Sequence, residues 1–407
     1  MMEPKIRFKG FEGEWRKAKL GDIATFSKGS GYSKSDLCKE GSPIVLYGRL
    51  YTKYQSIIDE IDTFVAPKAN SVISTGGEVI IPASGESPED ISLAATIKNA
   101  GVIIGGDLNV LKFDCNNNNP DFMSMAITYS PTRSELSNYS QGKTVVHLRN
   151  SEIAKGNVCF PRIEEQKAIV NYVLSLDSQI SASTSRLASL KQMKAASLQA
   201  MFPQEGETVP KIRFKGFEGE WTWLKLGDIS EQVKRKAPIN STAPVMMISA
   251  LNGFINQSEK YSDNNAGSSL ANYTLLKKGE LSYNHGYSKT RNFGSCFNLL
   301  VEEARIPFVY HSFRLTNDND SFYAYYLNSG TKDKDLKRLV SSTARMDGLL
   351  NISFKNYMEL SVPHPSLAEQ QAIANYFTSL DRQISLQSQR LEKLKQIKSA
   401  CLDKMFV

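Results

Sequence analysis

Twelve consecutive residues occur twice in this chain without a difference. The segment PKIRFKGFEGEW occupies residues 4–15 and recurs at residues 210–221, and KLGDI follows at 19–23 and 225–229 with the same offset of 206 residues. Exact repetition over such a length does not arise by chance, so the chain is built from two copies of one unit. We call residues 4–15 and 210–221 the opening segments.

A second repeated block closes each half of the chain. Residues 165–202 and 369–406 align without a gap, and 22 of the 38 positions are identical. Between the repeated parts, residues 24–150 and 230–350 show little evident identity. The chain therefore carries two different inserts in one repeated frame, with a Pro- and Gly-containing joint at residues 203–210.

Each closing block has the periodicity of a long helix. Apolar residues recur in alternating steps of four and three, and neither block contains glycine or proline, so each predicts a helix of about 40 residues. We expect the helices to pair as an antiparallel coiled coil if a pseudo-twofold relates the halves; alternatively, each helix covers its own domain. The expected pairing residues are Ile169, Val173, Leu176, Ile180, Leu187 and Leu190, with Ile373, Phe377, Leu380, Ile384, Leu391 and Leu394.

The two helix starts differ in sequence. Ser366 followed by Glu369 predicts a capping box for the second helix. The first copy has Arg162 where the capping serine would be, so this start signal is absent there.

Both inserts combine short apolar runs with helix signals, which predicts an α+β fold class. In each insert a run of strand-forming residues precedes an aromatic-rich helix, so we expect one fold with diverged surfaces. The expected strands cover residues 43–47, 78–82, 101–105, 108–113, 244–249 and 308–315, and the expected helices cover 121–129 and 321–328.

Composition narrows the class of protein. A length of 407 residues allows two or three domains, and a formal net charge of +7 permits an acidic partner but is weak evidence for one. No run approaches the ~18 apolar residues of a membrane helix, so we expect a cytoplasmic protein without membrane contact. The 5 cysteines are scattered and the 4 histidines lack ligand spacing, so we expect neither a disulfide framework nor a metal site.

Searches for catalytic motifs give one near match. Residues 137–144, SNYSQGKT, approach a Walker A loop, but Ser137 stands where the first glycine belongs. Polar residues precede this stretch and apolar residues follow it, which is the reverse of a phosphate loop. We interpret residues 141–144 as a polar tip able to touch a phosphate, and we expect no catalytic site in this chain.

Two stretches interleave cationic and aromatic residues, one in each insert. They lie at residues 47–54 and 283–291, and such groups can hold phosphate oxygens and base edges. A solvated loop with half-buried tyrosines is an equally good interpretation of either stretch. The candidate DNA contacts are Arg49, Tyr51, Lys53, Gln141 and Lys143 in the first insert, and Asn284, Tyr287, Lys289, Arg291 and Arg345 in the second.

The layout of opening segment, insert and closing helix, repeated once, resembles the specificity subunit of a type I restriction-modification enzyme. The segments IEEQKAI at residues 163–169 and LAEQQAI at 367–373 carry the resemblance most specifically. It covers essentially the whole chain. It lies in the frame, so it identifies the class of protein and leaves the DNA sequence open.

The resemblance implies two globular target recognition domains joined by two long helices that form an antiparallel coiled coil. The expected parts are residues 1–160 and 222–362 for the domains, 161–203 and 363–407 for the helices, and 204–221 for the linker with the second opening segment. Each domain would read one half of a split, asymmetric site on double-stranded DNA, and the helices would set the spacer.

The resemblance also implies that the chain is not an enzyme. It would dock two adenine methyltransferase subunits, and motor-nuclease subunits would join the full complex. No cofactor would bind this chain, while S-adenosylmethionine, ATP and Mg would serve the partner subunits. Docking would use the frame, with Trp15 and Trp221 either at that contact or in the core.

Two other functions fit parts of the sequence. A coiled-coil scaffold or RNA-binding adaptor would also have long helices and basic-aromatic loops, but no preference for a split duplex site. An ATP-using enzyme would depend on residues 141–144, and Lys143→Ala would abolish nucleotide binding.

Overall fold

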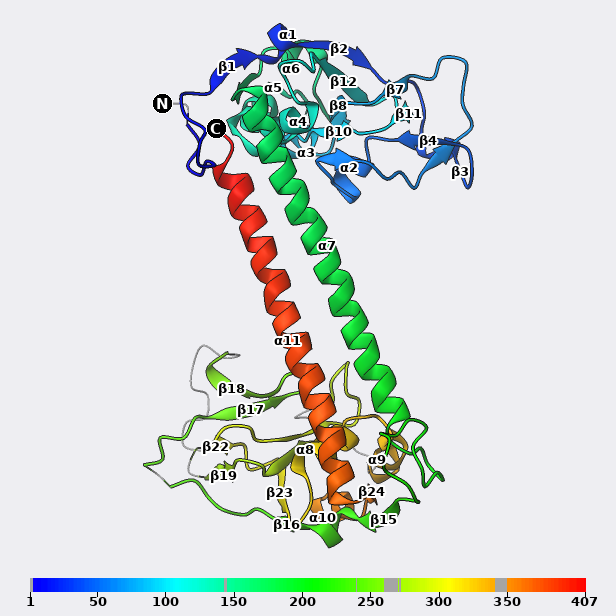
Figure 1. Ribbon diagram of the computed structural model, residues 1–407, viewed down its shortest axis with the longest axis vertical. Coiled ribbons are helices and arrows are strands. Elements are labelled where there is room, and N and C mark those ends of the chain that lie inside the picture. Colours follow the sequence, from blue (N-terminus) through cyan, green and yellow to red (C-terminus); the bar gives the residue numbers. More distant parts are fainter. Residues whose placement is uncertain (1–2, 143–144, 239, 260–269, 271, 341–349) are drawn as a thin grey trace. The chain divides into compact units, whose positions relative to one another are not determined.

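The computed structural model describes residues 3–142, 145–238, 240–259, 270, 272–340 and 350–407. The chain divides into two compact units (Figure 1). Unit 1 contains Met1–Thr184 and Arg390–Val407, and unit 2 contains Ser185–Gln389. This division cuts both long helices, so each unit holds the start of one long helix and the end of the other.

In unit 1, a strand pair encloses the first insert. Strand β1 (Arg16–Lys19) follows the opening segment and pairs antiparallel with β14 (Asn157–Phe160), which leads into the long helix α7. Two helices of the insert pack under this pair, α4 (Pro120–Tyr129) and α5 (Pro131–Tyr139). The shorter helical elements are α1 (Leu20–Ile23), η1 (Lys34–Asp36), α2 (Arg49–Thr52), α3 (Pro88–Ile91) and α6 (Asn150–Ile153).

The described part of the first insert contains two five-stranded sheets, in the orders β2-β12-β8-β10-β5 and β3-β6-β4-β11-β7. Successive side chains of a strand point to opposite faces. Val79 and Ile81 accordingly pack in the cluster that contains α4, whereas Ile80 packs toward the second sheet. Strand bounds are β2 (Ala24–Lys28), β3 (Leu37–Cys38), β4 (Ser42–Val45), β5 (Ile57–Ile58), β6 (Phe64–Val65), β7 (Ile73–Thr75), β8 (Glu78–Pro82), β9 (Ser84–Gly85), β10 (Ala95–Ile97), β11 (Ala100–Ile104), β12 (Leu108–Phe113) and β13 (Val146–His147).

Unit 2 repeats the enclosing pair but has a different sheet. Strand β15 (Thr222–Lys225) pairs antiparallel with β24 (Ser361–His364), and the described strands of the second insert form a four-stranded sheet, β16-β23-β20-β21, and the pairs β17-β18 and β19-β22. Strand bounds are β16 (Ser230–Gln232), β17 (Met246–Ser249), β18 (Gly253–Asn256), β19 (Thr274–Lys277), β20 (Leu281–Asn284), β21 (Ser295–Asn298), β22 (Glu303–Ile306) and β23 (His311–Leu315). Helix bounds are η2 (Leu226–Ile229), η3 (Gln257–Glu259), α8 (Asp320–Leu327), α9 (Asp333–Leu339) and α10 (Phe354–Met358).

The long helices are α7 (Ile163–Ala200) and α11 (Leu367–Lys404), each of 38 residues, as the sequence predicts. In unit 1, the Lys398 ammonium lies 2.5 Å from Asp177, and in unit 2 Lys194 lies 2.5 Å from Asp381. Tyr172 contacts Cys401 in unit 1 and Ser197 contacts Tyr376 in unit 2, so residue numbers rise along one helix as they fall along the other, and the two helices run antiparallel within each unit. The residues expected in the pairing seam are all buried or half-buried.

Both long helices begin at equivalent positions despite their different start signals. The carbonyl oxygen of Arg162 accepts from Glu165 and Gln166, just as that of Ser366 accepts from Glu369 and Gln370. The Ser366 hydroxyl also accepts from Glu369 N at 3.4 Å, but the Glu369 carboxylate is bound elsewhere, as described below. The predicted capping box is therefore only half formed.

The α+β class and the expected elements are confirmed. The helices expected at 121–129 and 321–328 are α4 and α8, and the expected strands appear as β4, β8, β11, β12, β17 and β23 with small shifts of their ends. In the described residues, no helix is long and apolar enough to cross a membrane.

Candidate functional site

An ion pair fixes the opening segment to the start of the long helix in each unit. The Arg7 guanidinium donates twice to the Glu165 carboxylate, at 2.8 and 2.8 Å. Arg213 and Glu369 repeat this bidentate pair at 2.6 and 2.7 Å. Each arginine also donates to two carbonyl oxygens of its own opening segment, which closes that segment into a loop. Both carboxylates are buried, so these are strong charge-assisted bonds.

A buried glutamine follows each of these glutamates and joins the insert to the same helix. The Gln166 Oε1 accepts from Asn119 N at 2.8 Å, and its Nε2 donates to the carbonyl oxygens of Asn117 and Pro161. In unit 2, the Gln370 Oε1 accepts from Asn319 N at 2.9 Å. We call each Glu-Gln pair with these partners the Glu-Gln hub.

The opening segment also contacts the end of the other long helix within its unit. In unit 1, Ile6 N donates to Lys404 O of α11 at 3.0 Å, while Phe8 packs edge-on against Tyr172 of α7, so the segment contacts both helices. In unit 2, Ile212 N donates to Ala200 O at 2.9 Å, and the Phe214 and Tyr376 rings form the equivalent pair. The exact repeat therefore has a structural reason at its arginine and first phenylalanine.

The buried tryptophans of the two opening segments differ in one bond. Trp221 Nε1 donates to the Glu369 carboxylate at 3.1 Å. Trp15 is equally buried, but within the described structure its Nε1 has no hydrogen-bond partner. Both rings pack against the first phenylalanine of the core helix, Phe122 or Phe322. The tryptophans are therefore core residues, which answers the alternative that the sequence leaves open.

The first three candidate contacts lie on α2 or directly after it, and all three side chains have partners within unit 1. The Arg49 side chain is 8% exposed and donates to Asp62, Gln55 and the carbonyl oxygen of Glu60. The Tyr51 hydroxyl donates to Ser84 O at 2.7 Å. Lys53 is exposed and pairs with the exposed Asp62 carboxylate. An exposed ion pair contributes little, so Lys53 can exchange Asp62 for another partner, whereas Arg49 would have to leave three acceptors.

Gln141 lies on an exposed turn between α5 and β13. Its backbone exchanges two hydrogen bonds with His147, at 2.9 and 2.8 Å, and Tyr139, His147 and Arg149 line a shallow hollow beside it. A helix precedes this turn and a strand follows it, which is the reverse of a phosphate loop. Lys143 lies outside the described residues.

The second group of candidates lies at the end of β20, which Asn284 closes, and in the loop between β20 and β21. Asn284 accepts from Gly286 N at 3.0 Å, and the Arg291 guanidinium donates to the carbonyl oxygen of Asn328. Burial lowers the pKa of Arg291. Tyr287, at 62% exposure, and Lys289 project from the loop. Arg345 lies outside the described residues.

Stacked aromatic rings pack next to the start of this loop. The His285 and His311 rings are parallel with centroids 4.8 Å apart, and Tyr283 stacks on Tyr357 at 4.0 Å. His285 is buried, with its ring nitrogens 2.6 Å from Leu350 O and 3.0 Å from Val309 O. The loop that carries Tyr287 and Lys289 thus follows a buried, stacked and hydrogen-bonded group of rings.

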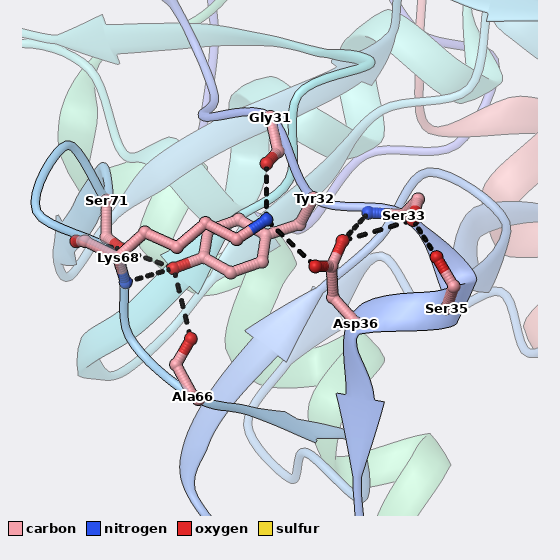
Figure 2. A network of polar contacts seen from close by, with 8 residues as sticks. All are labelled: Gly31, Tyr32, Ser33, Ser35, Asp36, Ala66, Lys68 and Ser71. Atoms are coloured by element: carbon pink, nitrogen blue, oxygen red, sulfur yellow. Dashed lines mark hydrogen bonds and ion pairs between the residues drawn. The ribbon is translucent and has the colours of Figure 1, made fainter.

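Figure 2 shows a polar network that joins two loops of the first insert. The Lys68 ammonium lies 4.4 Å from the centre of the Tyr32 ring and donates to Asp36 at 2.9 Å. The hydrogen bond from Lys68 lowers the pKa of the Asp36 carboxyl to about 2. Tyr32 also accepts from Lys68 N at 2.7 Å. This network fixes the ends of the second sheet and has no counterpart that we identify in the described part of unit 2.

The candidate residues fall into two kinds. Lys53, Gln141, Tyr287 and Lys289 are exposed, and Lys53 has only an exposed ion pair with Asp62. In contrast, four candidates are half-buried and bonded within their own unit: Arg49, Tyr51, Asn284 and Arg291. In the described residues, no group of three His, Cys, Asp or Glu side chains could hold a metal ion.

The repeated Glu-Gln motif can be recognised in the sequence, but the sequence does not show that these side chains join the insert to the long helix. A buried glutamine within a helix looks like a surface residue from periodicity, because glutamine is normally exposed. The signal that could have found Gln166 and Gln370 is their occurrence at the same place in two copies, next to a glutamate whose arginine partner is also repeated.

Comparison with known proteins gives consistent matches. The model of a family described as the type I restriction modification DNA specificity domain matches this chain twice, at residues 12–192 and 218–396. The chain is also similar to the crystal structure of a type I restriction-modification system S subunit from M. genitalium, with 16% sequence identity and a TM-score of 0.58 over 100% of this chain and 99% of that chain.

A second similar structure is the HsdS subunit from Thermoanaerobacter tengcongensis, with 16% identity and a TM-score of 0.49 over 96% of each chain. A third, from a study of complex assembly and conformational transition of the type I R-M system, has 16% identity and a TM-score of 0.48 over 96% of this chain and 97% of that chain.

Proposed function

Because this chain belongs to the type I restriction modification DNA specificity family, whose members are non-catalytic specificity subunits, we propose that each unit reads one half of a bipartite, asymmetric DNA site. Each insert would recognise one half-site, and the paired helices would set the unspecified spacer. One observation supports this most strongly: the same Glu-Gln hub carries two inserts whose exposed residues differ.

The exposed residues suit contact with duplex DNA. Lys53 and Lys289 can each neutralise a phosphate, and Tyr287 can meet a sugar or a base edge. Since the two inserts present different residues, the half-sites should differ in sequence. A true homodimer would instead read a palindrome.

We propose further that the opening segments dock two copies of one partner, an adenine methyltransferase subunit. Four charged residues of each segment are exposed and identical in both copies: Lys5, Lys9, Glu12 and Glu14, and Lys211, Lys215, Glu218 and Glu220. Two identical surfaces fit two identical partners. S-adenosylmethionine, ATP and Mg²⁺ would then belong to the methyltransferase and motor-nuclease subunits of the full complex.

Methylation mapping tests the reading of DNA. Deletion of the gene should erase adenine methylation at one split motif across the genome, and restoring the gene should bring it back. A methylome that does not change on deletion would refute the proposal.

Exchange of an insert tests whether the two readings are independent. Replacing residues 24–150 by the corresponding insert of another family member should change one half of the methylated motif and leave the other half and the spacer as they were. A change in both halves would contradict independent reading.

Charge reversal tests the docking surface. Lys9→Glu or Lys215→Glu should each reduce the number of bound methyltransferase subunits from two to one, and the double variant should lose both, as measured by native mass spectrometry. Lys17→Glu is the matched control, because Lys17 is exposed but lies outside the repeat. Two bound subunits in the double variant would exclude this surface.

A further inference from the structure

We propose that Gln166 and Gln370 are positioning residues that fix the orientation of each insert on its long helix and so restrict the protein to the one DNA spacer that the paired helices set. This inference rests on the proposed reading of a split DNA site. It assigns a task to two side chains that do not touch DNA themselves.

The Gln166 amide joins three parts of unit 1. It is fully buried, and its oxygen accepts from Asn119 N at 2.8 Å while its nitrogen donates to Asn117 O at 3.1 Å and Pro161 O at 2.9 Å. Asn119 is also the cap of α4, since its side chain accepts from Phe122 N at 3.1 Å. One side chain of α7 therefore holds the start of α4 and the turn that precedes α7.

Gln370 makes the same connection in unit 2 with one changed partner. Its nitrogen donates to Pro365 O at 3.0 Å and to the Asp318 carboxylate at 2.8 Å. Its oxygen accepts from Asn319 N, and Asn319 caps α8 by accepting from Phe322 N at 2.9 Å. The arrangement is thus retained although the sheets of the two inserts differ.

The direction of these hydrogen bonds restricts the rotation of each insert about its long helix as well as the distance between them. A planar amide that accepts one bond and donates two keeps them only over a narrow range of angles. Helices α4 and α8 lie in the cores of their units, so a change of angle at the hub moves the whole insert with them. A rotation of about 10° displaces a point about 20 Å away by roughly 3.5 Å, close to one base-pair step.

The exposed loop residues and the hub therefore have separable tasks. The loops determine which bases each half-site contains, the length of the paired helices sets the spacer, and the hub holds each insert at the angle that this spacer requires. Loss of the hub should relax the spacing while the bases stay the same. A side chain that merely stabilised the fold would instead reduce methylation at every spacing alike.

The test replaces the gene at its own locus by Gln166→Met or Gln370→Met, which keep the side-chain length but remove all three bonds. Adenine methylation is then mapped at genomic sites that carry both half-sites at the normal spacing, or one base pair longer or shorter. We expect the ratio of altered-spacing to normal-spacing methylation to rise at least about fivefold, with both half-sites unchanged. Lys167→Met, an exposed neighbour of Gln166, should match the parent.

Each other outcome has a defined meaning. An unchanged ratio in active variants, altered bases in a half-site, or loss of methylation at all spacings in both variants would overturn the positioning role. If the parent itself methylates no split motif, the proposed function fails, and this failure is visible before any glutamine variant is compared.

Discussion

Unit 1 and unit 2 hold their opening segments by the same ion pair but surround it differently. Glu369 receives Arg213 and also Trp221 Nε1, whereas Glu165 receives Arg7, and Trp15 Nε1 has no partner in the described structure. The inserts differ much more, with two five-stranded sheets in the described part of unit 1 and a four-stranded sheet in that of unit 2. The comparison indicates that the bonds between frame and insert are kept while the surfaces beyond them diverge.

The largest expected effect comes from breaking the ion pair in each unit. Arg7→Met leaves the buried Glu165 carboxylate without its cation and should destabilise unit 1 by about 3 kcal/mol. Arg213→Met should cost about 2 kcal/mol, because Glu369 keeps the bond from Trp221. Hydrogen exchange of peptides from each unit measures the two losses separately.

The exposed Lys5 provides the control for this comparison, since Lys5→Met should change neither unit. If Arg213→Met reduced stability as much as Arg7→Met, the bond from Trp221 would not compensate for the lost arginine.

The two buried tryptophans allow a second comparison of unit 1 with unit 2. Trp221→Phe removes a hydrogen bond to a buried carboxylate, whereas Trp15→Phe removes an N–H group that has no partner in the described structure. Both variants lose similar apolar contact, so Trp221→Phe should reduce stability by about 1.5 kcal/mol more than Trp15→Phe. Urea unfolding of the full chain, followed by exchange in each unit, measures the difference. Equal costs would show that the Trp221 bond contributes nothing to stability.

Much of the fold follows from the sequence because it is local. The two 38-residue helices follow from apolar periodicity and the absence of glycine and proline, and α4 and α8 follow from an aromatic-rich helix pattern after a strand. These features depend on neighbours a few residues away, where pattern and structure are directly linked.

The candidate contacts were harder to predict because their partners are distant in sequence. The stretch around Arg49 looks like a binding loop, but Asp62 and the carbonyl oxygen of Glu60 occupy its guanidinium once the chain folds. Arg291 likewise meets Asn328 O. A sequence shows which side chains can bind an anion, but only tertiary contacts show which of them are already bonded.

The exposed lysines allow the two inserts to be compared in DNA binding. Lys53→Ala and Lys289→Ala should each weaken binding by about 1 kcal/mol at low salt and reduce the salt dependence by about one phosphate contact. The loss should be the same for matched and mismatched half-sites, because a phosphate contact carries no sequence information. Titration of the complete complex with labelled duplex at several salt concentrations measures this.

Tyr287→Ala serves as the contrasting variant in that titration. If Tyr287 meets a base, its removal should relax the preference at one half-site only. An unchanged salt dependence in both lysine variants would exclude Lys53 and Lys289 from the DNA interface.

The smallest expected difference is a pH dependence of unit 2. Burial lowers the pKa of His311 below its ordinary value of 6.5, with His285 acting in the same direction. The unfolded state therefore binds a proton more readily than the folded state, so stability falls as the pH drops below about 6.5. Between pH 7.5 and 6.0 this loss is at most about 0.8 kcal/mol, because it cannot exceed the protonation of an ordinary histidine in the unfolded chain.

His311→Phe should reduce this slope in unit 2 and leave that of unit 1 unchanged. Phenylalanine retains the ring that packs against His285, Phe354 and Tyr357 but loses the bond to Ile352 O, so its absolute stability differs and the slope is the useful quantity. Exchange of unit 2 peptides, corrected for intrinsic rates at each pH, gives the slope for both proteins. If the parent and His311→Phe have the same slope, proton uptake by His311 does not distinguish the units. The units would then differ in the Trp221–Glu369 bond and in their inserts.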